Sequence, residues 1–470
     1  MTGTLRIAHI TTVDISLQNL LRNQLLSLTA DGYEVTGISA PGPYVAAFAT
    51  CGLRHISVPM TRKLTPWADL ASLWRLYRVM RREQFTIVHT HTPKAGLLGQ
   101  LAARLAGVPI IVNTVHGFYF HEHMHPSVRR FYITLEKLAA CCSDLILSQN
   151  AEDCETALRE AICRREKIKL LGNGIDLTQF NPERISPKDQ LECRQKIGIP
   201  AGVPVVGFVG RLAARRKGFL DFLAAAKQIA GQRPEVRFLI VGGADQGKAD
   251  AVDPSIASEF GIADRCRFLG FRPGAELPAL YRIMSVLVLP SLFEGVPRVV
   301  MEASAMGVPC IVTDVKGNRE AVVHERNGYL VPLGDAPALA TSILRVLSEP
   351  ETAERMGREA RRMATERFDE RTVFDKIKTE YTRLLRAKGW WLRTPRPAEQ
   401  HPFALRLHDG SRPRRQSTAD SSSAGLSNLK KAFGTLLLSR RPRLQFAATL
   451  RKPTVATDPD GDRADHFNRT

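Results

Sequence analysis

Two stretches in the second half of the chain carry charged residues at spacings that suit an anionic ligand. The first, residues 210–218, follows a β-branched run, begins and ends in glycine, and holds Arg211, Arg216 and Lys217. Glycines where a strand meets a helix, beside fixed cations and a helix N-terminus, make a site for a diphosphate. A solvated basic loop is the alternative interpretation, and this stretch alone leaves both open.

The second stretch carries two glutamates, Glu294 and Glu302, on either side of Pro297. Since proline suits the first turn of a helix, Glu294 is predicted in the loop before that helix and Glu302 two turns inside it. If the whole stretch were helical, its rise would separate the two by about 12 Å. Glycosidase carboxylate pairs lie roughly 5 to 9.5 Å apart, so this pair suits opposite ends of an elongated ligand, such as a sugar and a ribose joined by a diphosphate. A capped surface helix is the alternative.

Two series of alternating strands and helices would position these residues. Strands are expected at 5–13, 34–39, 54–59, 85–90, 109–115, 144–148 and 167–171, and again at 203–210, 236–241, 265–269, 286–289 and 309–313. Such alternation is typical of parallel sheets that are covered by helices on both faces. The pattern breaks at the glycine-flanked turn 172–176 and the polar stretch that follows it, which indicates a linker.

The fold class predicted from this pattern is α/β, with two tandem doubly wound domains and a ligand cleft at the C-terminal ends of their strands. We predict a first domain at residues 1–182, a linker at 183–202, a second domain with closing helices at 203–388, and a flexible basic tail at 389–470. Among its 470 residues the chain carries 66 Lys and Arg against 47 Asp and Glu, a formal net charge of +19. The tail alone holds 15 Lys and Arg against 7 Asp and Glu, so we expect no nucleic-acid partner for the folded body.

The chain shows no uncharged apolar run of the ~18 to 20 residues that a membrane span needs, and its start is too polar for a signal sequence. A cytoplasmic protein is therefore expected. Two segments could still lie on an anionic membrane surface: the helical pattern at 426–438 in the tail, and the Trp- and Arg-rich helix at 66–82. For the tail segment, packing back onto the protein is an equal alternative. For the helix at 66–82, burial of the apolar face on the sheet is the favoured interpretation.

The histidines between residues 89 and 125 invite a metal interpretation, because His89 and His91 share one face at strand spacing. No acidic third ligand with a clear geometry follows them, and the eight cysteines form no C-x-x-C pair. A role in lining a cleft is therefore favoured, and we predict no essential metal.

Taken together, these stretches resemble the retaining GT-B glycosyltransferases of family four, over about residues 4–385. The resemblance rests on the loop 210–218, the two glutamates with seven residues between them, Asn173-Gly174-Ile175-Asp176, and the stretch 313–320. The stretches 89–96 and 116–122 resemble the subset that elongates lipid-linked bacterial surface glycans, such as O-antigen or capsule. The GT-B fold that this implies consists of two Rossmann-like domains facing each other across a cleft.

The resemblance also implies roles for individual residues. Arg211 and Lys217 would neutralise the departing diphosphate, and Glu302 would bind the ribose hydroxyls of a nucleotide sugar. Glu294 would hold the sugar hydroxyls and stabilise the reacting centre, with His116 contacting the sugar from the other domain.

Further donor contacts are implied for the backbone amides of Gly295 and Val296, and the segment that ends at Arg272 would read the base. Two departures from the family pattern stand out. The family's Gly-Gly pair after the first strand is replaced by residues 11–16, which are Thr-Thr-Val-Asp-Ile-Ser, and the spacing from Arg211 to Lys217 is one residue longer than expected, so Arg216 is a candidate for the lysine's role.

The favoured function is retaining, metal-independent transfer of a sugar, most simply from a UDP-sugar, to a hydroxyl of a polyprenyl-diphosphate-linked saccharide. The nucleotide sugar is a substrate, and no cofactor is expected. Preorganised cations and helix amides would stabilise the charge that grows on the leaving phosphate. A sugar-nucleotide epimerase of the same architecture, or a non-catalytic scaffold that binds nucleotide sugars or membranes, are the alternatives.

Overall fold

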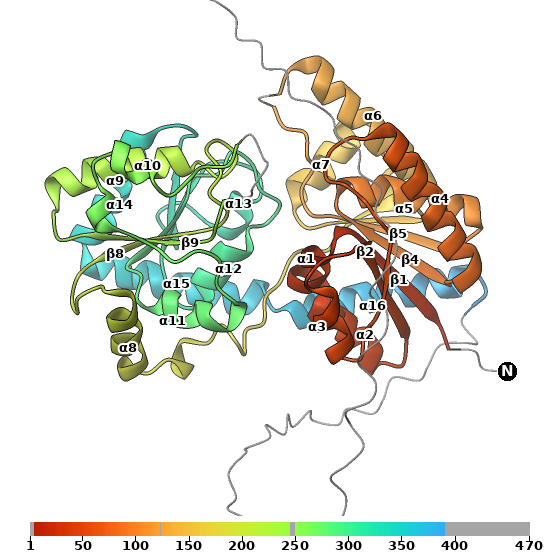
Figure 1. The fold of residues 1–470 in the computed structure, drawn as a ribbon, viewed down its shortest axis with the longest axis horizontal. Helices are drawn as coiled ribbons and strands as arrows, with labels where there is room; N and C mark the ends of the chain where they lie inside the picture. Colours follow the sequence, from red (N-terminus) through yellow and green to blue (C-terminus); the bar gives the residue numbers. More distant parts are fainter. Residues whose placement is uncertain (1–3, 123, 245–249, 391–470) are drawn as a thin grey trace, which may run out of the picture. The chain divides into compact units, whose positions relative to one another are not determined.

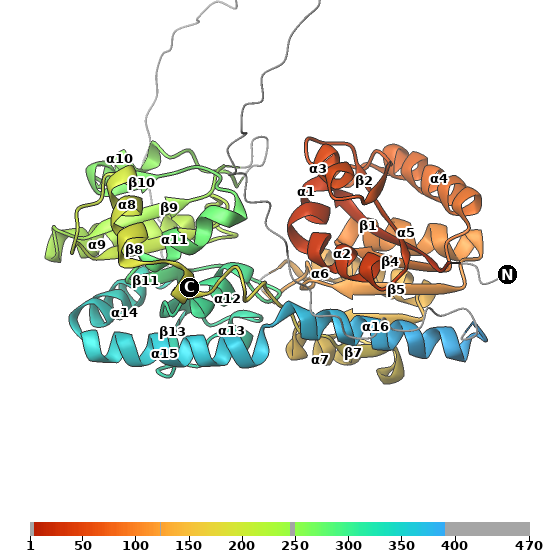
Figure 2. The same cartoon turned by 90° about the horizontal axis from the view of Figure 1, so that it is seen from below.

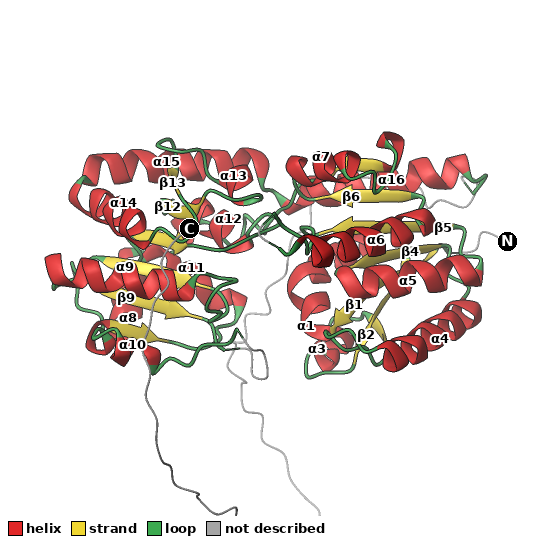
Figure 3. Cartoon of the chain, turned by 90° about the horizontal axis from the view of Figure 1, so that it is seen from above, coloured by secondary structure: helices red, strands yellow, loops and turns green. Residues whose placement is uncertain are grey.

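The computed structural model describes residues 4–122, 124–244 and 250–390, and it contains two parallel β-sheets with helices on both faces (Figures 1 and 3). The predictions for a flexible tail and for a helix at 426–438 lie outside the described residues. The α/β fold class is confirmed.

The two sheets repeat one strand order. The first sheet contains β1 (Arg6–Val13), β2 (Glu34–Ala40), β3 (Arg54–Ser57), β4 (Ile87–His91), β5 (Ile110–Val115), β6 (Leu145–Ser148) and β7 (Ile168–Leu170), in the order β3-β2-β1-β4-β5-β6-β7. The second contains β8 (Val205–Val209), β9 (Arg237–Val241), β10 (Cys266–Phe268), β11 (Val286–Leu289), β12 (Cys310–Thr313) and β13 (Gly328–Val331), in the order β10-β9-β8-β11-β12-β13. The order reverses beside β1 and beside β8, and ligands bind at such switch points in doubly wound sheets.

Helices connect the strands of both sheets. In the first half they are α1 (Asp14–Ser16), the π-helix Leu17–Leu21, α2 (Arg22–Ala30), α3 (Val45–Thr50), α4 (Pro66–Glu83), α5 (Pro93–Ala106), α6 (Pro126–Cys142) and α7 (Ala151–Arg159). In the second half they are α8 (Pro187–Ile197), α9 (Phe219–Gln232), α10 (Ile256–Glu259), α11 (Leu277–Arg282), α12 (Arg298–Ala305), α13 (Asn318–Ala321), α14 (Ala336–Ser348), α15 (Pro350–Arg367) and α16 (Glu370–Ala387).

The last helix does not follow the predicted domain division. Residues 203–388 were assigned to the second domain with its closing helices, yet α16 buries Ile377, Tyr381 and Leu385 in a core cluster with Leu5 and Ile7 of the first sheet. Figure 2 shows α15 alongside the second sheet and α16 alongside the first. The apolar spacing of α16 predicts a buried face but does not say which sheet receives it.

Two further elements were not predicted. Within the expected linker 183–202, Ser186 caps α8 in a capping box with Asp189, and Cys193 and Ile197 of this helix pack against the second core. Strand β13 was not predicted because the connection that leads to it from β12 contains only the four-residue helix α13. A longer crossover helix is usual between parallel strands. The boundaries 1–182 and 183–202 themselves stay predictions.

Helix α4 exposes part of its apolar surface, contrary to the favoured interpretation. Leu76 and Met80 are buried against the first sheet, whereas Trp67 is 84% exposed, Leu70 58% and Trp74 59%. At helical spacing, residues 67, 70 and 74 lie on the side opposite Leu76, so packing on the sheet covers only one stripe of the helix. In the part of the chain that the structure describes, no helix is long and apolar enough to cross a membrane.

Glu83 connects the C-terminal end of α4 to the first sheet through hydrogen bonds. This buried carboxylate accepts hydrogen bonds from Arg54 at 2.7 Å, from Arg6 at 3.0 Å and from Arg82 at 3.0 Å. The hydrogen bond from Arg54 is the largest cause that lowers the pKa of Glu83 to about 2, and Arg82 adds to it.

We expect Glu83→Gln to lower the free energy of unfolding by about 2 kcal/mol at pH 7, since the charge-assisted hydrogen bonds are lost. Because folding depresses this pKa, the contribution is complete above the unfolded value and is lost as the pH falls towards 2. Urea unfolding at pH 7 and pH 3 should therefore show a smaller difference between variant and wild type at the lower pH. Glu354→Gln, in an exposed ion pair with Arg358, is the control and should change little. A Glu83→Gln penalty that is equal at both pH values would contradict this account.

Candidate active site

The two charged stretches leave the sheet from adjacent strands. Strands β8 and β11 pair in parallel, with Val206 opposite Val286, and their C-terminal ends continue into the loops 210–218 and 290–297. The carboxyl ends of parallel strands meet at one edge, so the two loops must touch. They do so through a hydrogen bond from the amide of Leu292 to the carbonyl oxygen of Arg216 at 3.1 Å.

Gly218 allows this close approach of the loops. Its φ is +62°, and a Cβ at this position would lie 1.9 Å from the carbonyl oxygen of Pro290. A backbone atom cannot move aside as the end of a side chain can, so only glycine fits here.

The loop contact brings opposite charges together. Lys217 forms an ion pair with Glu294, and both side chains are largely buried. The guanidinium of Arg216 lies 4.6 Å from the centre of the Phe293 ring. Burial, and then the positive charge of Arg211, lower the pKa of Arg216. The predicted residues Arg211, Arg216, Lys217 and Glu294 therefore form one group at the switch point of the second sheet.

An aspartate that the sequence did not single out shapes this basic loop. The carboxylate of Asp250 accepts hydrogen bonds from the amides of Arg215 at 2.9 Å and Arg216 at 3.0 Å. The main-chain carbonyl oxygen of Asp250 accepts a third from the amide of Ala214 at 2.8 Å. These bonds hold the loop in one conformation. In the sequence Asp250 is one acidic residue far from the basic loop, and nothing in the pattern identifies that loop as its partner.

Glu302 occupies a separate, buried position in α12. Glu294 lies in the loop and Glu302 in the second turn, as predicted, although Pro297 precedes the helix rather than lying in its first turn. The Tyr281 hydroxyl donates to Glu302 Oε2 at 2.9 Å, and Arg298 Nε lies 3.7 Å from Oε1. Burial, the largest cause, raises the pKa of Glu302.

Arg272 follows β10 and forms an ion pair with Glu276 at 3.5 Å. The structure records this contact rather than one with the loop 210–218. Its predicted part in donor binding stays a prediction.

Glycines let the backbone of residues 116–117 and of residue 317 approach the loop that carries Glu294. A Cβ on Gly295 would lie 2.2 Å from the carbonyl oxygen of His116, and one on Gly117 would lie 2.8 Å from the Cα of Gly295. A Cβ on Gly317, whose φ is +77°, would lie 1.8 Å from the carbonyl oxygen of Gly295. The loop that carries Glu294 thus packs directly on the backbone of residues 116–117.

Two asparagines of the first half hold the same loop. Asn150 donates to the carbonyl oxygen of Gly295 at 3.2 Å, and Asn173 donates to that of Val296 at 3.0 Å. Asn150 also caps α7, where its side chain accepts from the amide of Asp153. Sequence reasoning missed Asn150, and its place before a helical pattern signals the cap but not the second contact.

The predicted stretch 313–320 adds charged contacts to α7. Arg319 binds Glu152 through two parallel hydrogen bonds of 2.8 Å each, and Glu320 accepts the amide of Ala151 at 2.8 Å. Bidentate arginine–carboxylate pairs fix geometry as well as energy. Arg319 and Glu320 of this stretch therefore connect it to α7.

In the loop after β1, the side chain of Asp14 is held by backbone amides. The carboxylate of Asp14 accepts the amides of Ile15 at 2.9 Å and Tyr44 at 2.8 Å. A Cβ on Gly42 would lie 2.2 Å from Asp14 Oδ2.

His116 follows directly after β5 and is half-buried. Its Nε2 faces His91 Nδ1 at 3.0 Å, and burial lowers its pKa to about 4, so the imidazole is neutral at physiological pH. A small cavity of about 30 Å³ is lined by His91, His116, Gln149 and Arg298, among other residues.

The comparisons with known proteins identify the family. Residues 189–363 match the family described as glycosyl transferases group 1, and residues 18–174 match the glycosyl transferase 4-like domain. The UDP-Gal:alpha-D-GlcNAc-diphosphoundecaprenol alpha-1,3-galactosyltransferase of Escherichia coli is 32% identical over 382 residues, which cover 80% of this chain and 96% of the relative. The capsular polysaccharide biosynthesis glycosyltransferase CapM of Staphylococcus aureus is 25% identical over 81% of this chain and 98% of its own.

Solved structures agree on the fold. A glycosyltransferase from Rickettsia africae superposes with a TM-score of 0.67 at 19% identity, over 82% of this chain and 99% of that one. HepE of Anabaena in complex with UDP-glucose superposes with a TM-score of 0.69 at 22% identity, over 81% and 100%. The chain belongs to the group 1 glycosyl transferases, and the predicted GT-B fold is confirmed.

We expect Gly295→Ala to separate the loop 290–297 from residues 116–117, because the new methyl group would meet backbone atoms. Hydrogen exchange of both segments should become faster. Gly231→Ala is the matched control, since a Cβ there meets open space at the end of α9 and should be neutral or stabilising by up to about 1 kcal/mol. Unchanged exchange in Gly295→Ala would show that the contact is absent in solution.

Proposed function

We propose that this glycosyltransferase moves a sugar from a UDP-sugar, with retention, to a hydroxyl of a polyprenyl-diphosphate-linked saccharide in surface polysaccharide biosynthesis. The observation that carries the proposal is the ion pair of Lys217 with Glu294, with Arg211 and Arg216 beside it. The name of the Escherichia coli relative, which includes both a UDP-sugar donor and a diphosphoundecaprenol acceptor, supports the choice of substrates.

The cations of the loop 210–218 would receive the leaving group. When the bond between the anomeric carbon and the diphosphate oxygen breaks, two electrons and a negative charge stay on the phosphate. Lys217 and Arg211 lie where they can bind that charge, at the N-terminal end of α9. Because the donors are held in place before the reaction, little reorganisation is needed, and we propose that no metal ion is required.

Glu294 would work on the sugar side of the same bond. Its ion pair with Lys217 supports this role, because a carboxylate beside the cation that binds the diphosphate could accept hydrogen bonds from the sugar hydroxyls. The amides of Gly295 and Val296 follow it in the loop. The acceptor oxygen would bond to the anomeric carbon on the face that the phosphate leaves, while its proton passes to the departing phosphate oxygen.

The nucleoside would lie towards Glu302 and the segment that ends at Arg272. Glu302 Oε2 accepts from Tyr281, and Oε1, which lies 3.7 Å from Arg298 Nε, would accept from the ribose hydroxyls. Burial raises the pKa of Glu302, and the positive charge of Arg298 opposes this only in part.

We predict that Lys217→Met and Glu294→Gln each reduce acceptor-dependent UDP release by about 100-fold to 1000-fold, as the loss of one oxyanion-stabilising donor does. The assay contains purified full-length protein, a panel of UDP-sugars and polyprenyl-diphosphate-linked saccharides from membrane extract. Lys188→Met, in an exposed pair on α8, is the matched control and should keep full activity.

Three outcomes would overturn the proposal. Full activity of Lys217→Met would show that the charge of Lys217 is not needed for the transfer. Isomerisation of the UDP-sugar without an acceptor would show an epimerase, and binding of the UDP-sugar without turnover would show a scaffold.

We further propose that α4 docks the enzyme on the anionic cytoplasmic surface of the membrane, where a lipid-linked acceptor is found. Trp67, Leu70 and Trp74 are exposed on the N-terminal half of its outward face. Arg75, Arg78, Arg81 and Arg82 follow and, with Ser57, line an open groove of about 660 Å³. Indole rings favour the lipid headgroup level and arginines attract anionic lipids.

Flotation with vesicles tests this docking surface. We expect binding to phosphatidylglycerol vesicles but not to phosphatidylcholine vesicles, and at least a tenfold loss in Trp67→Ser/Trp74→Ser and in Arg78→Gln/Arg82→Gln. Leu191→Ser, which removes an exposed leucine from α8, should bind like the wild type. Equal binding of all variants would place the membrane contact elsewhere.

A further inference from the structure

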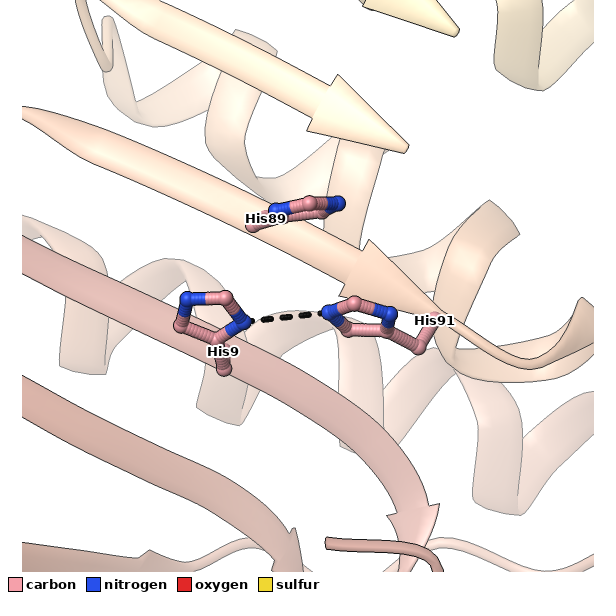
Figure 4. A group of neighbouring side chains, drawn as sticks. All are labelled: His9, His89 and His91. Carbon is pink, nitrogen blue, oxygen red and sulfur yellow. Dashed lines mark hydrogen bonds between the residues drawn. The ribbon is translucent and has the colours of Figure 1, made fainter. Parts of the chain in front are cut away.

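A cluster of histidines lies inside the first sheet, away from the charged loops. His9 of β1 is directly opposite His89 of β4, and His91 is two residues further along β4 on the same face. Figure 4 shows the three rings close together, with the hydrogen bond between His9 and His91. All three are at most 1% exposed. The sequence indicated His89 and His91 but not His9, because strand pairing is needed to bring it there.

Hydrogen bonds join these rings to His116 in an unbroken chain. His91 Nδ1 lies 3.0 Å from His116 Nε2, and His91 Nε2 lies 3.0 Å from His9 Nδ1. The Tyr381 hydroxyl of α16 lies 3.4 Å from His9 Nε2 and 2.6 Å from His89 Nδ1.

The chain has a defined end on either side. At the inner end, His89 Nε2 lies 2.7 Å from the Thr114 hydroxyl. At the outer end, His91 faces Nε2 of His116, so Nδ1 is the ring nitrogen that remains for a hydrogen bond with the Gln149 side chain.

Elementary chemistry fixes how protons are distributed along this chain. A neutral imidazole has one N–H donor and one acceptor nitrogen, and each hydrogen bond needs one of each. If His91 donates from Nδ1 to His116, its Nε2 must accept from His9 Nδ1. His9 Nε2 then accepts from the Tyr381 hydroxyl, whose oxygen accepts from His89 Nδ1. All four histidines therefore carry the proton on the same nitrogen, Nδ1 in one direction or Nε2 in the other. A protonated ring would set two N–H groups against each other, and burial lowers the pKa of His9 to about 3.

One of the two directions satisfies more donors. With the proton on Nδ1 throughout, the Thr114 hydroxyl donates to His89 Nε2, and His116 Nδ1 donates to Gln149. In the reverse direction Thr114 must accept, and its own hydroxyl hydrogen then has no acceptor among the contacts recorded for the described residues. An unsatisfied buried donor costs about 1–3 kcal/mol, so the Nδ1–H direction is favoured.

We propose that His9, His91 and Tyr381 are positioning residues, which hold His116 as the neutral Nδ1–H tautomer and so present an N–H donor to a hydroxyl oxygen of the donor sugar. The role in sugar binding rests on the proposed function, whereas the shared tautomer does not. Gln149 accepts this hydrogen until the sugar replaces it. The cluster also has the geometry of a three-histidine metal site, with ligand atoms within 4.8 Å of one another. Each of those nitrogens already has a partner in the chain, and we therefore argue for the hydrogen-bonded form.

Nitrogen NMR of the full-length protein, labelled on histidine, tests the chain directly. The chemical shifts of the ring nitrogens distinguish Nδ1–H, Nε2–H and charged imidazole. We expect His9, His89, His91 and His116 to be neutral Nδ1–H tautomers at pH 7, unchanged when Zn²⁺ is added. Mixed tautomers, a charged ring, or one equivalent of bound metal in elemental analysis would overturn the proposal.

Tyr381→Phe breaks the chain without touching His116 and keeps a ring of nearly the same shape in the core. We expect His116 to become a mixture of tautomers, and KM for the UDP-sugar to rise at least fivefold with a smaller change in kcat. Tyr329→Phe is the matched control, because that buried hydroxyl has no recorded hydrogen bond, and it should alter neither readout. A pure Nδ1–H tautomer of His116 in Tyr381→Phe would overturn the positioning role. If the four tautomers are as expected but no sugar is transferred, only the proposed function fails.

Discussion

The ion pair between Lys217 and Glu294 is the interaction on which the account of this enzyme depends. It forms because β8 and β11 are neighbours in the second sheet, so the basic loop after one strand meets the acidic loop after the other. Gly218 permits the approach and Asp250 shapes the basic loop. A cation next to a carboxylate at the end of a parallel sheet can bind the two parts of a sugar diphosphate, the phosphate at the cation and the sugar at the carboxylate.

The contacts between the two halves of the chain extend this arrangement. Gly295 follows Glu294 directly and packs on the backbone of His116, so the first sheet would bound the sugar side of the proposed site. Helix α16 returns to that sheet and brings Tyr381 into its interior, beside His9 and His89. Helix α16 is thereby connected, through the imidazole rings of His9 and His91, to His116, the residue proposed to contact the sugar.

Most strands could be predicted from the sequence because their signals are local, whereas the grouping of the basic loop with Glu294 was implied by the family resemblance. Alternating apolar runs predict strands, and their order places neighbouring loops at one edge. Other features depend on partners far away in the chain. The missed histidine, His9, needs strand pairing to reach His91, and the exposure of Trp67 depends on how little of α4 the sheet covers. The apolar spacing of α16 is equally compatible with burial on either sheet.

Nucleotide binding tests the central claim most directly, because the diphosphate is the group that the loop 210–218 is proposed to hold. Isothermal titration of UDP and of UMP should show a clear preference of the wild type for UDP, and Lys217→Met should lose most of it while binding UMP unchanged. A preference for UDP that is the same in Lys217→Met as in the wild type would contradict the account.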